Sequence, residues 1–327
     1  MVRIILLIAC LAGSAIGASN EPPVAFTAPT PVEDRNAAIA YQRAWLMAPE
    51  GVLDQVPTPE TLEASLEGIG GGDSLIQMLL AATRIDGCDF QTPFEQGTDA
   101  PLPHLTLIRR TGQLLIADAQ SLFEFGDYAG IAERLAAVIR LADHTTNDRV
   151  FVSSMTAGRL LADVEPVVVE LAATGELGAD SRAVLLDALA RFERDDPYRI
   201  SDAIARVVEV SIANSIPALL AGDREDAATH AGTLDTFGSG EREPRVSDER
   251  REALMAEVRP WVTDAIAAWN AENALNELRA LHQAAQQGRY GTLGQKGLYS
   301  IVRARSEQDR WDAALESMRA ALADDSE

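Results

Sequence analysis

Apolar residues recur at steps of three and four along most of the chain, which is the spacing of one face of an α-helix. Ala37, Ala40, Tyr41 and Ala44 follow this spacing near the start. From residue 105 to residue 142 the same spacing continues on both sides of a Gly126-Asp127 break, which predicts a helical hairpin. We identify no segment with the alternating, β-branched pattern of a sheet. The sequence therefore predicts an all-α fold of stacked antiparallel helical hairpins, either solenoid-like or a helical bundle.

Several further helices follow from the same spacing. Thr58 and Pro59 have the residue types of an N-cap and a first helical position. Later helices are predicted at residues 150–174, 181–192, 197–221 and 254–269, and a last pair at 293–323. Residues 237–246 are rich in Gly, Ser and charge, as expected of a joint. We thus predict a helical domain at 33–236 and a C-terminal helical segment at 247–327 that packs on it or forms a second subdomain.

The first eighteen residues have the pattern of an export signal, with Arg3 followed by an apolar run from residue 4 to 16. That run is about a dozen residues, whereas a membrane-spanning helix needs about 20. Residues 1–18 are therefore predicted to be a signal peptide cleaved after Gly17 or Ala18, and the Pro-rich residues 19–32 a flexible linker. We expect a periplasmic or extracellular protein. The alternative is a lipid anchor through Cys10, which ends a lipobox-like run.

Composition narrows the function classes. The formal charge of −22 disfavours nucleic acid and anionic lipid as partners. Hydrophobic residues make up 47% of the sequence, enough for a large core. Cys10 leaves with the predicted signal, so Cys88 has no partner for an internal disulfide.

We find no sequence motif that binds a metal ion or a cofactor. The four histidines, His104, His144, His230 and His282, are too far apart in sequence for two to share a helical turn, and no His-Glu-x-x-His helix or Asp-rich calcium loop occurs. His144 is placed near a helix C-terminus, where the helix dipole favours a cation. We predict no metal site and no cofactor.

Catalytic motifs are equally sparse. No Gly-x-Ser-x-Gly occurs, and the acidic neighbours Asp86 and Asp89 raise the pKa of the Cys88 thiol, which predicts an inert cysteine. Asp195-Asp196 before Pro197 are predicted to cap a helix. No catalytic residue is assigned.

Two irregular stretches leave alternatives open. Residues 88–103 hold several Pro and Phe residues, and form either a packed crossover between helical layers or a binding loop. From Gly288 to Gly297 a glycine occupies every third position, with Arg289 and Lys296 between them. This stretch is predicted to be a flexible connection, the alternative being contact with an anion or a partner.

Three stretches resemble the second helix of a tetratricopeptide repeat. The stretch at Trp311 has small and apolar residues at the expected steps, the one at Tyr128 has the larger Ile131 at the small position, and the one at Arg224 lacks the aromatic residue. The separations between the three stretches do not fit a regular array. The chain also resembles exported helical proteins of GC-rich bacteria. The stacked hairpins imply a scaffold that binds a protein or peptide in a groove. The alternatives are a polysaccharide-active enzyme on a helical barrel and a structural component of the envelope.

Overall fold

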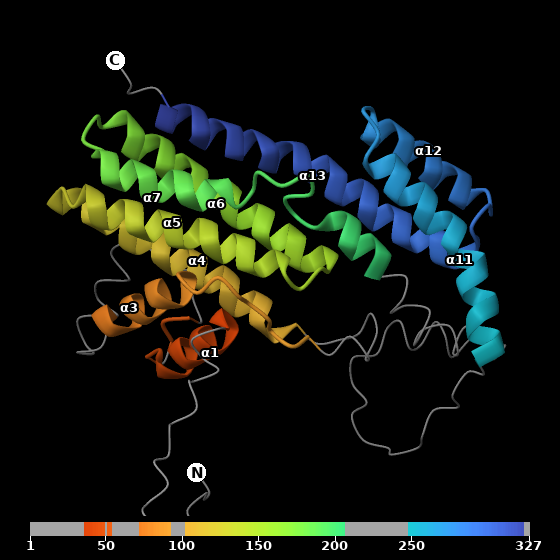
Figure 1. The fold of residues 1–327 in the computed structure, drawn as a ribbon, viewed down its shortest axis with the longest axis horizontal. Coiled ribbons are helices and arrows are strands. Elements are labelled where there is room, and N and C mark those ends of the chain that lie inside the picture. Colours follow the sequence, from red (N-terminus) through yellow and green to blue (C-terminus); the bar gives the residue numbers. More distant parts are fainter. Residues whose placement is uncertain (1–35, 50, 54–71, 93–101, 207–247, 324–327) are drawn as a thin grey trace, which may run out of the picture.

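The computed structural model describes residues 36–49, 51–53, 72–92, 102–206 and 248–323 (Figure 1). All regular elements in these ranges are helices, which confirms the predicted all-α class. Their bounds in chain order are α1 (Ala37–Met47), α3 (Gly72–Thr83), α4 (Pro103–Leu122), the 3₁₀ turn η3 (Phe123–Phe125), α5 (Tyr128–Thr146), α6 (Phe151–Ala173), α7 (Ala179–Ala190), α11 (Asp248–Trp269), α12 (Ala274–Gln286) and α13 (Gly291–Ala323).

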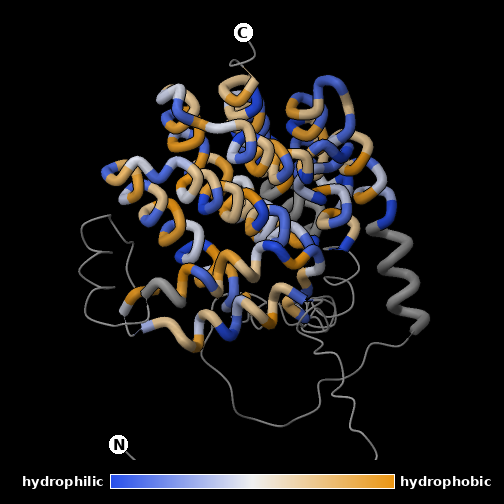
Figure 2. The backbone as a smooth tube through the Cα atoms, turned by 60° about the vertical axis from the view of Figure 1, so that its left-hand side comes forward, coloured by the Kyte–Doolittle hydropathy of each residue, from blue (hydrophilic) through white to orange (hydrophobic). Residues whose placement is uncertain are grey.

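The helices form layers around α5 and α6 (Figure 1). α1 and α3 pair with each other on one side, and α13 lies across α6 and α7 on the other. α11 and α12 pack along the part of α13 that extends beyond this central group. Figure 2 shows hydrophobic and hydrophilic positions sharing the circumference of each helix, as the periodicity predicted. None of the described helices combines the length and the apolar character needed to cross a membrane.

The turn between α4 and α5 has the predicted form. Gly126 adopts a left-handed conformation with φ of 66°, which costs glycine little. Asp127 then caps α5, because its carboxylate accepts a hydrogen bond of 2.9 Å from the amide of Gly130. This local chemistry reverses the chain and places α5 beside α4.

The predicted helix pair at 293–323 is wrong. α13 is one helix of 33 residues, and the turn before it is confined to residues near Gly288, which has a φ of 95°. Gly291, Gly294 and Gly297 therefore lie inside the helix and not in a loop. Each glycine costs a helix about 1 kcal/mol, and packing of α13 along α12 and α6 outweighs that cost.

The α6–α13 contact depends on a small residue. Gly158 of α6 faces the buried indole of Trp311 in α13, and a Cβ at residue 158 would lie only 2.1 Å from the Trp311 ring. The indole also packs edge-on against Tyr198, at a centroid distance of 5.1 Å. The absence of a side chain at residue 158 thus allows α13 to lie close to the central helices.

Several predicted segments lie outside the described residues. These are the signal peptide at 1–18, the linker at 19–32, the helix start at Thr58, the repeat-like stretch from Arg224 and the joint at 237–246.

Candidate functional site: a charged cleft between α3, α5 and α7

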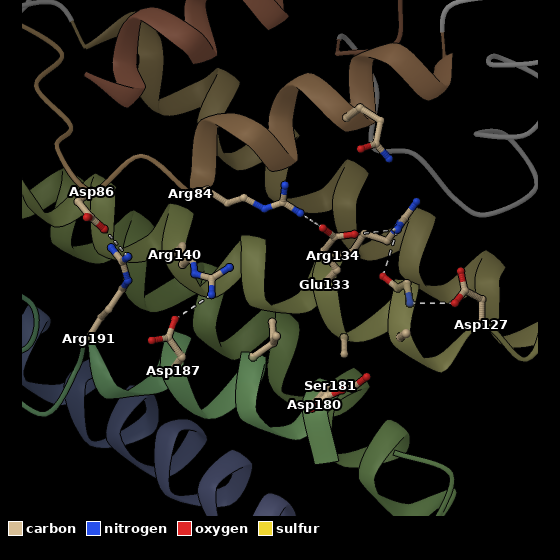
Figure 3. A pocket seen from close by; sticks show the side chains of 15 residues that line it. Arg84, Asp86, Asp127, Glu133, Arg134, Arg140, Asp180, Ser181, Asp187 and Arg191 are labelled. Carbon is tan, nitrogen blue, oxygen red and sulfur yellow. Dashed lines mark hydrogen bonds and ion pairs between the residues drawn. The ribbon is translucent and has the colours of Figure 1, made fainter. Parts of the chain in front are cut away.

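An open cleft with a volume of about 890 Å³ lies along α5, between α3 and α7 (Figure 3). Each of these helices, or the turn that follows it, contributes charged side chains to the cleft. The basic residues are Arg84, Arg134, Arg140 and Arg191, and the acidic ones are Asp86, Asp127, Glu133, Asp180 and Asp187.

The register of α5 and α7 sets the order of charges along the cleft. Contacts join Arg140 to Asp187 and Asp143 to Arg191, so both helices run in the same direction. Their N-terminal ends bring Asp127 and Asp180 to one end of the cleft, where the helix dipoles favour negative charge. Arg140 and Arg191 lie toward the other end (Figure 3). Asp127 and Asp180 thus lie at one end of the cleft, which Arg134 shares, and the ion pairs Arg140–Asp187 and Arg191–Asp86 lie toward the other end.

Ion pairs connect the three helices across the cleft. Arg84 pairs with Glu133 and thereby links the end of α3 to α5. Nη2 of Arg140 lies 2.9 Å from Oδ2 of Asp187, which links α5 to α7. Nη2 of Arg191 lies 2.9 Å from Oδ1 of Asp86, just after α3.

The two partners of each pair at the arginine end differ in exposure. The side chains of Arg140 and Arg191 are 13% and 23% exposed, whereas those of Asp187 and Asp86 are 69% and 91% exposed. The guanidinium groups thus form the base of the cleft and the carboxylates its rim.

The buried carboxylate of Asp143 contacts Arg191 at the base of the cleft and also the neighbouring Arg194. Oδ2 of Asp143 lies 3.5 Å from Nη1 of Arg191, and Oδ1 lies 2.9 Å from Nη1 of Arg194. Arg194 also donates to the hydroxyl of Thr146 and to the carbonyl of Pro197. Arg191 therefore has a second, buried anionic partner besides the exposed Asp86.

His144 lies in the last turn of α5, as predicted, but its expected positive charge is wrong. The side chain is fully buried, and its Nδ1 lies 3.0 Å from the hydroxyl of Tyr41. Burial lowers the pKa of His144 from 6.5 to about 4. The cost of desolvating a cation thus exceeds the favourable effects of the helix dipole and of Asp143.

His104 belongs to a second buried cluster centred on Asp148. Nε2 of His104 lies 2.6 Å from Oδ2 of Asp148, and the hydroxyls of Ser153 and Thr92 donate to the same carboxylate at 2.9 and 3.2 Å. The His104 ring also stacks on Phe90, with centroids 4.4 Å apart. Asp148 was not predicted, because His104 and Thr92 are 44 and 56 residues away from it.

The described part of the 88–103 stretch is packed against the helices. Asp89 exchanges two hydrogen bonds with the side chain of Asn36, at 3.0 and 2.9 Å. Cys88 is buried, and burial, followed by the charges of Asp148 and Asp89, raises its pKa well above the usual value. The thiol is therefore held in its unreactive form, as predicted. Residues 93–101 lie outside the described part of the chain.

The remaining candidates also have structural roles. Asp196 caps the helical segment 200–206, since its two carboxylate oxygens accept from the amides of Ile200 and Ser201 at 3.0 and 2.8 Å. This confirms the predicted capping role. His282 of α12 lies 3.0 Å from Gln286, and His230 is outside the described residues. Within the described ranges, no group of three or more His, Cys, Asp or Glu side chains could hold a metal ion.

No family model, curated protein or solved structure matches the chain. The fold and the site define an all-α helical bundle with an open cleft lined by acidic and basic residues. Function is therefore inferred from this cleft.

Proposed function

We propose that the protein is an exported binding module and that the cleft between α3, α5 and α7 holds a peptide segment of a protein partner. The observation that carries the proposal is the cleft itself, which is open, polar and bounded by three packed helices. Side chains on packed helices are positioned more precisely than those on loops, which reduces the ordering cost of binding.

The chemistry of the cleft suits a polypeptide. The carboxylates and arginines that line the cleft can pair with the charges and backbone dipoles of an extended chain. Apolar and small residues also line the cleft: Ala129, Gly130 and Ala132 lie in the first turns of α5, and Val184 lies on α7 between Asp180 and Asp187.

The ion pairs favour binding over the enzyme alternative. A polysaccharide-cleaving site needs two carboxyl groups that exchange protons with the substrate. In this cleft Glu133 and Asp187 are each paired with an arginine that connects two helices. They therefore act as ion-pair partners that define the walls of the cleft.

Photo-cross-linking from α7 tests the proposal. A photoreactive residue replaces Val184, which lines the cleft, in the tagged full-length chain expressed with its own signal. The matched control places the same residue at Leu186, an exposed position two residues away that is not part of the cleft lining. We expect a discrete protein adduct from position 184 and none from position 186. No adduct from 184, or equal adducts from both positions, would contradict the proposal.

A further inference from the structure

We infer that Arg140 and Arg191 bind a carboxylate of the bound peptide. Without the peptide, the carboxylates of Asp187 and Asp86 pair with these arginines, and the peptide carboxylate displaces them when it binds. This inference rests on the proposed peptide-binding function and specifies the chemical group that the arginine end of the cleft recognises.

The difference in exposure identifies the partner that exchanges. Asp187 and Asp86 stand at the rim, so they can rotate into water at little cost, and exposed ion pairs of this kind contribute little to stability. Arg140 and Arg191 are largely covered, and a partly buried charge without a counter-ion is costly. The arginines therefore stay in place, and an incoming anion takes over the position of each carboxylate.

The same difference disfavours a basic ligand. A lysine or arginine of a partner would have to draw Asp187 away from Arg140, which is only 13% exposed, and Asp86 away from Arg191, which would keep only its 3.5 Å contact with Asp143. An incoming carboxylate instead reproduces the contacts that Asp187 and Asp86 make at 2.9 Å. Guanidinium groups also bind carboxylates through two parallel hydrogen bonds when geometry permits.

The two arginines lie toward the same end of the cleft (Figure 3). Arg191 contacts Asp143, which lies three residues after Arg140 on α5, and three residues span about 4.5 Å along a helix. Arg140 and Arg191 thus reach the cleft from neighbouring positions along α5 and α7.

The acidity of the whole chain does not prevent this recognition. The formal charge is −22, yet at physiological ionic strength charges are largely screened beyond about 8 Å. A carboxylate in the cleft therefore responds mainly to the nearby arginines and to the exposed acids that it displaces.

The test measures fluorescence anisotropy of labelled Gly-Ser peptides titrated with the mature protein. One peptide carries two adjacent Glu residues and an amidated C-terminus, a second carries Gln in place of Glu, and a third has no Glu but a free C-terminal carboxylate. We expect the first or the third peptide to bind more tightly than the second. Which of the two binds shows whether the carboxylate comes from a side chain or from a chain end.

Variants of the ion pairs make the test specific. Arg140→Gln and Arg191→Gln should each weaken binding at least about tenfold, as expected for loss of a charge-assisted hydrogen bond. Asp187→Asn removes the internal competitor and should tighten binding about two- to fivefold. Because Asp187 is exposed, the Asp187→Asn substitution leaves the core unchanged, so a change in affinity reports on binding and not on folding. Arg159→Gln and Asp163→Asn change an ion pair on α6 that does not line the cleft, so they are the controls and should leave binding unchanged.

Three outcomes overturn the inference. They are equal affinity for all three peptides, unchanged affinity in Arg140→Gln, and no binding of any peptide to either the wild type or Asp187→Asn. The proposed function is decided separately by the adduct at position 184, so a cleft that captures a partner without recognising a carboxylate would be distinguished from a cleft that captures none.

Discussion

Replacing Gly158 with alanine should destabilise the contact between α6 and α13. The new Cβ would lie 2.1, 2.3 and 2.6 Å from three atoms of the Trp311 indole, whereas ordinary contacts begin near 3.4 Å. The rigid, buried indole must therefore move by more than 1 Å, and α13 with it. Overpacking of this kind costs about 1–3 kcal/mol, and the better helix propensity of alanine returns up to about 1 kcal/mol. We expect the free energy of unfolding to fall by about 2 kcal/mol in urea titrations followed by far-UV circular dichroism.

Gly112→Ala is the matched control for this prediction. A Cβ at residue 112 would also be close to a neighbour, at 2.3 Å, but that neighbour is the terminal Cδ2 of Leu160 and the next atom is 3.6 Å away. A flexible leucine end can rotate, so we expect a change within about 1 kcal/mol. The cost of Gly158→Ala should also shrink when Trp311 is replaced by phenylalanine. A Gly158→Ala variant that is as stable as Gly112→Ala would refute the packing argument.

Three further predictions concern buried polar groups and a cap. Because the folded-state pKa of His144 is lowered, the unfolded chain takes up this proton first, so stability should fall by about 3 kcal/mol between pH 6.5 and about 4. The slope in that window should flatten in His144→Gln, and an unchanged slope would contradict the assignment. Asp148→Asn should lower the free energy of unfolding by about 2–4 kcal/mol, against no more than about 0.5 kcal/mol for Asp163→Asn, whose partner Arg159 is exposed, and equal effects would contradict the central role of Asp148. Asp196→Ala should cost about 1 kcal/mol through the lost cap, measured by the same urea titration, and a neutral effect would argue against capping.

The fold class could be predicted because its determinants are local. Helical spacing around Ala137 and Leu141, and the Gly126-Asp127 turn, depend on residues within a few positions of one another. The helix boundary at Gly291 could not be predicted in the same way. Its local glycine pattern favours a loop, whereas α13 as a whole packs against α12 and against α6, which is distant in sequence, and this packing favours a helix.

The cleft could not be predicted from the sequence, because no local residue pattern marks it. Arg140 and Asp187 are 47 residues apart, and Arg191 and Asp86 are 105 apart, so each looks like an ordinary solvated position on its own helix. Only the packing of α5 between α3 and α7 brings these charges to one surface. His144 shows the complementary case, since its position in the helix was predictable but its complete burial, and hence its neutral form, was not.

The most direct test of the binding cleft compares the adduct formed from position 184 in the wild-type background with that formed in Arg140→Gln. Both proteins carry the same photoreactive residue in α7, and only the carboxylate receptor differs. We predict that the partner adduct is strong in the wild type and at least about tenfold weaker in Arg140→Gln under limiting partner. An adduct of equal yield in both would contradict recognition through the arginines, and its absence from both would contradict the cleft as the binding site.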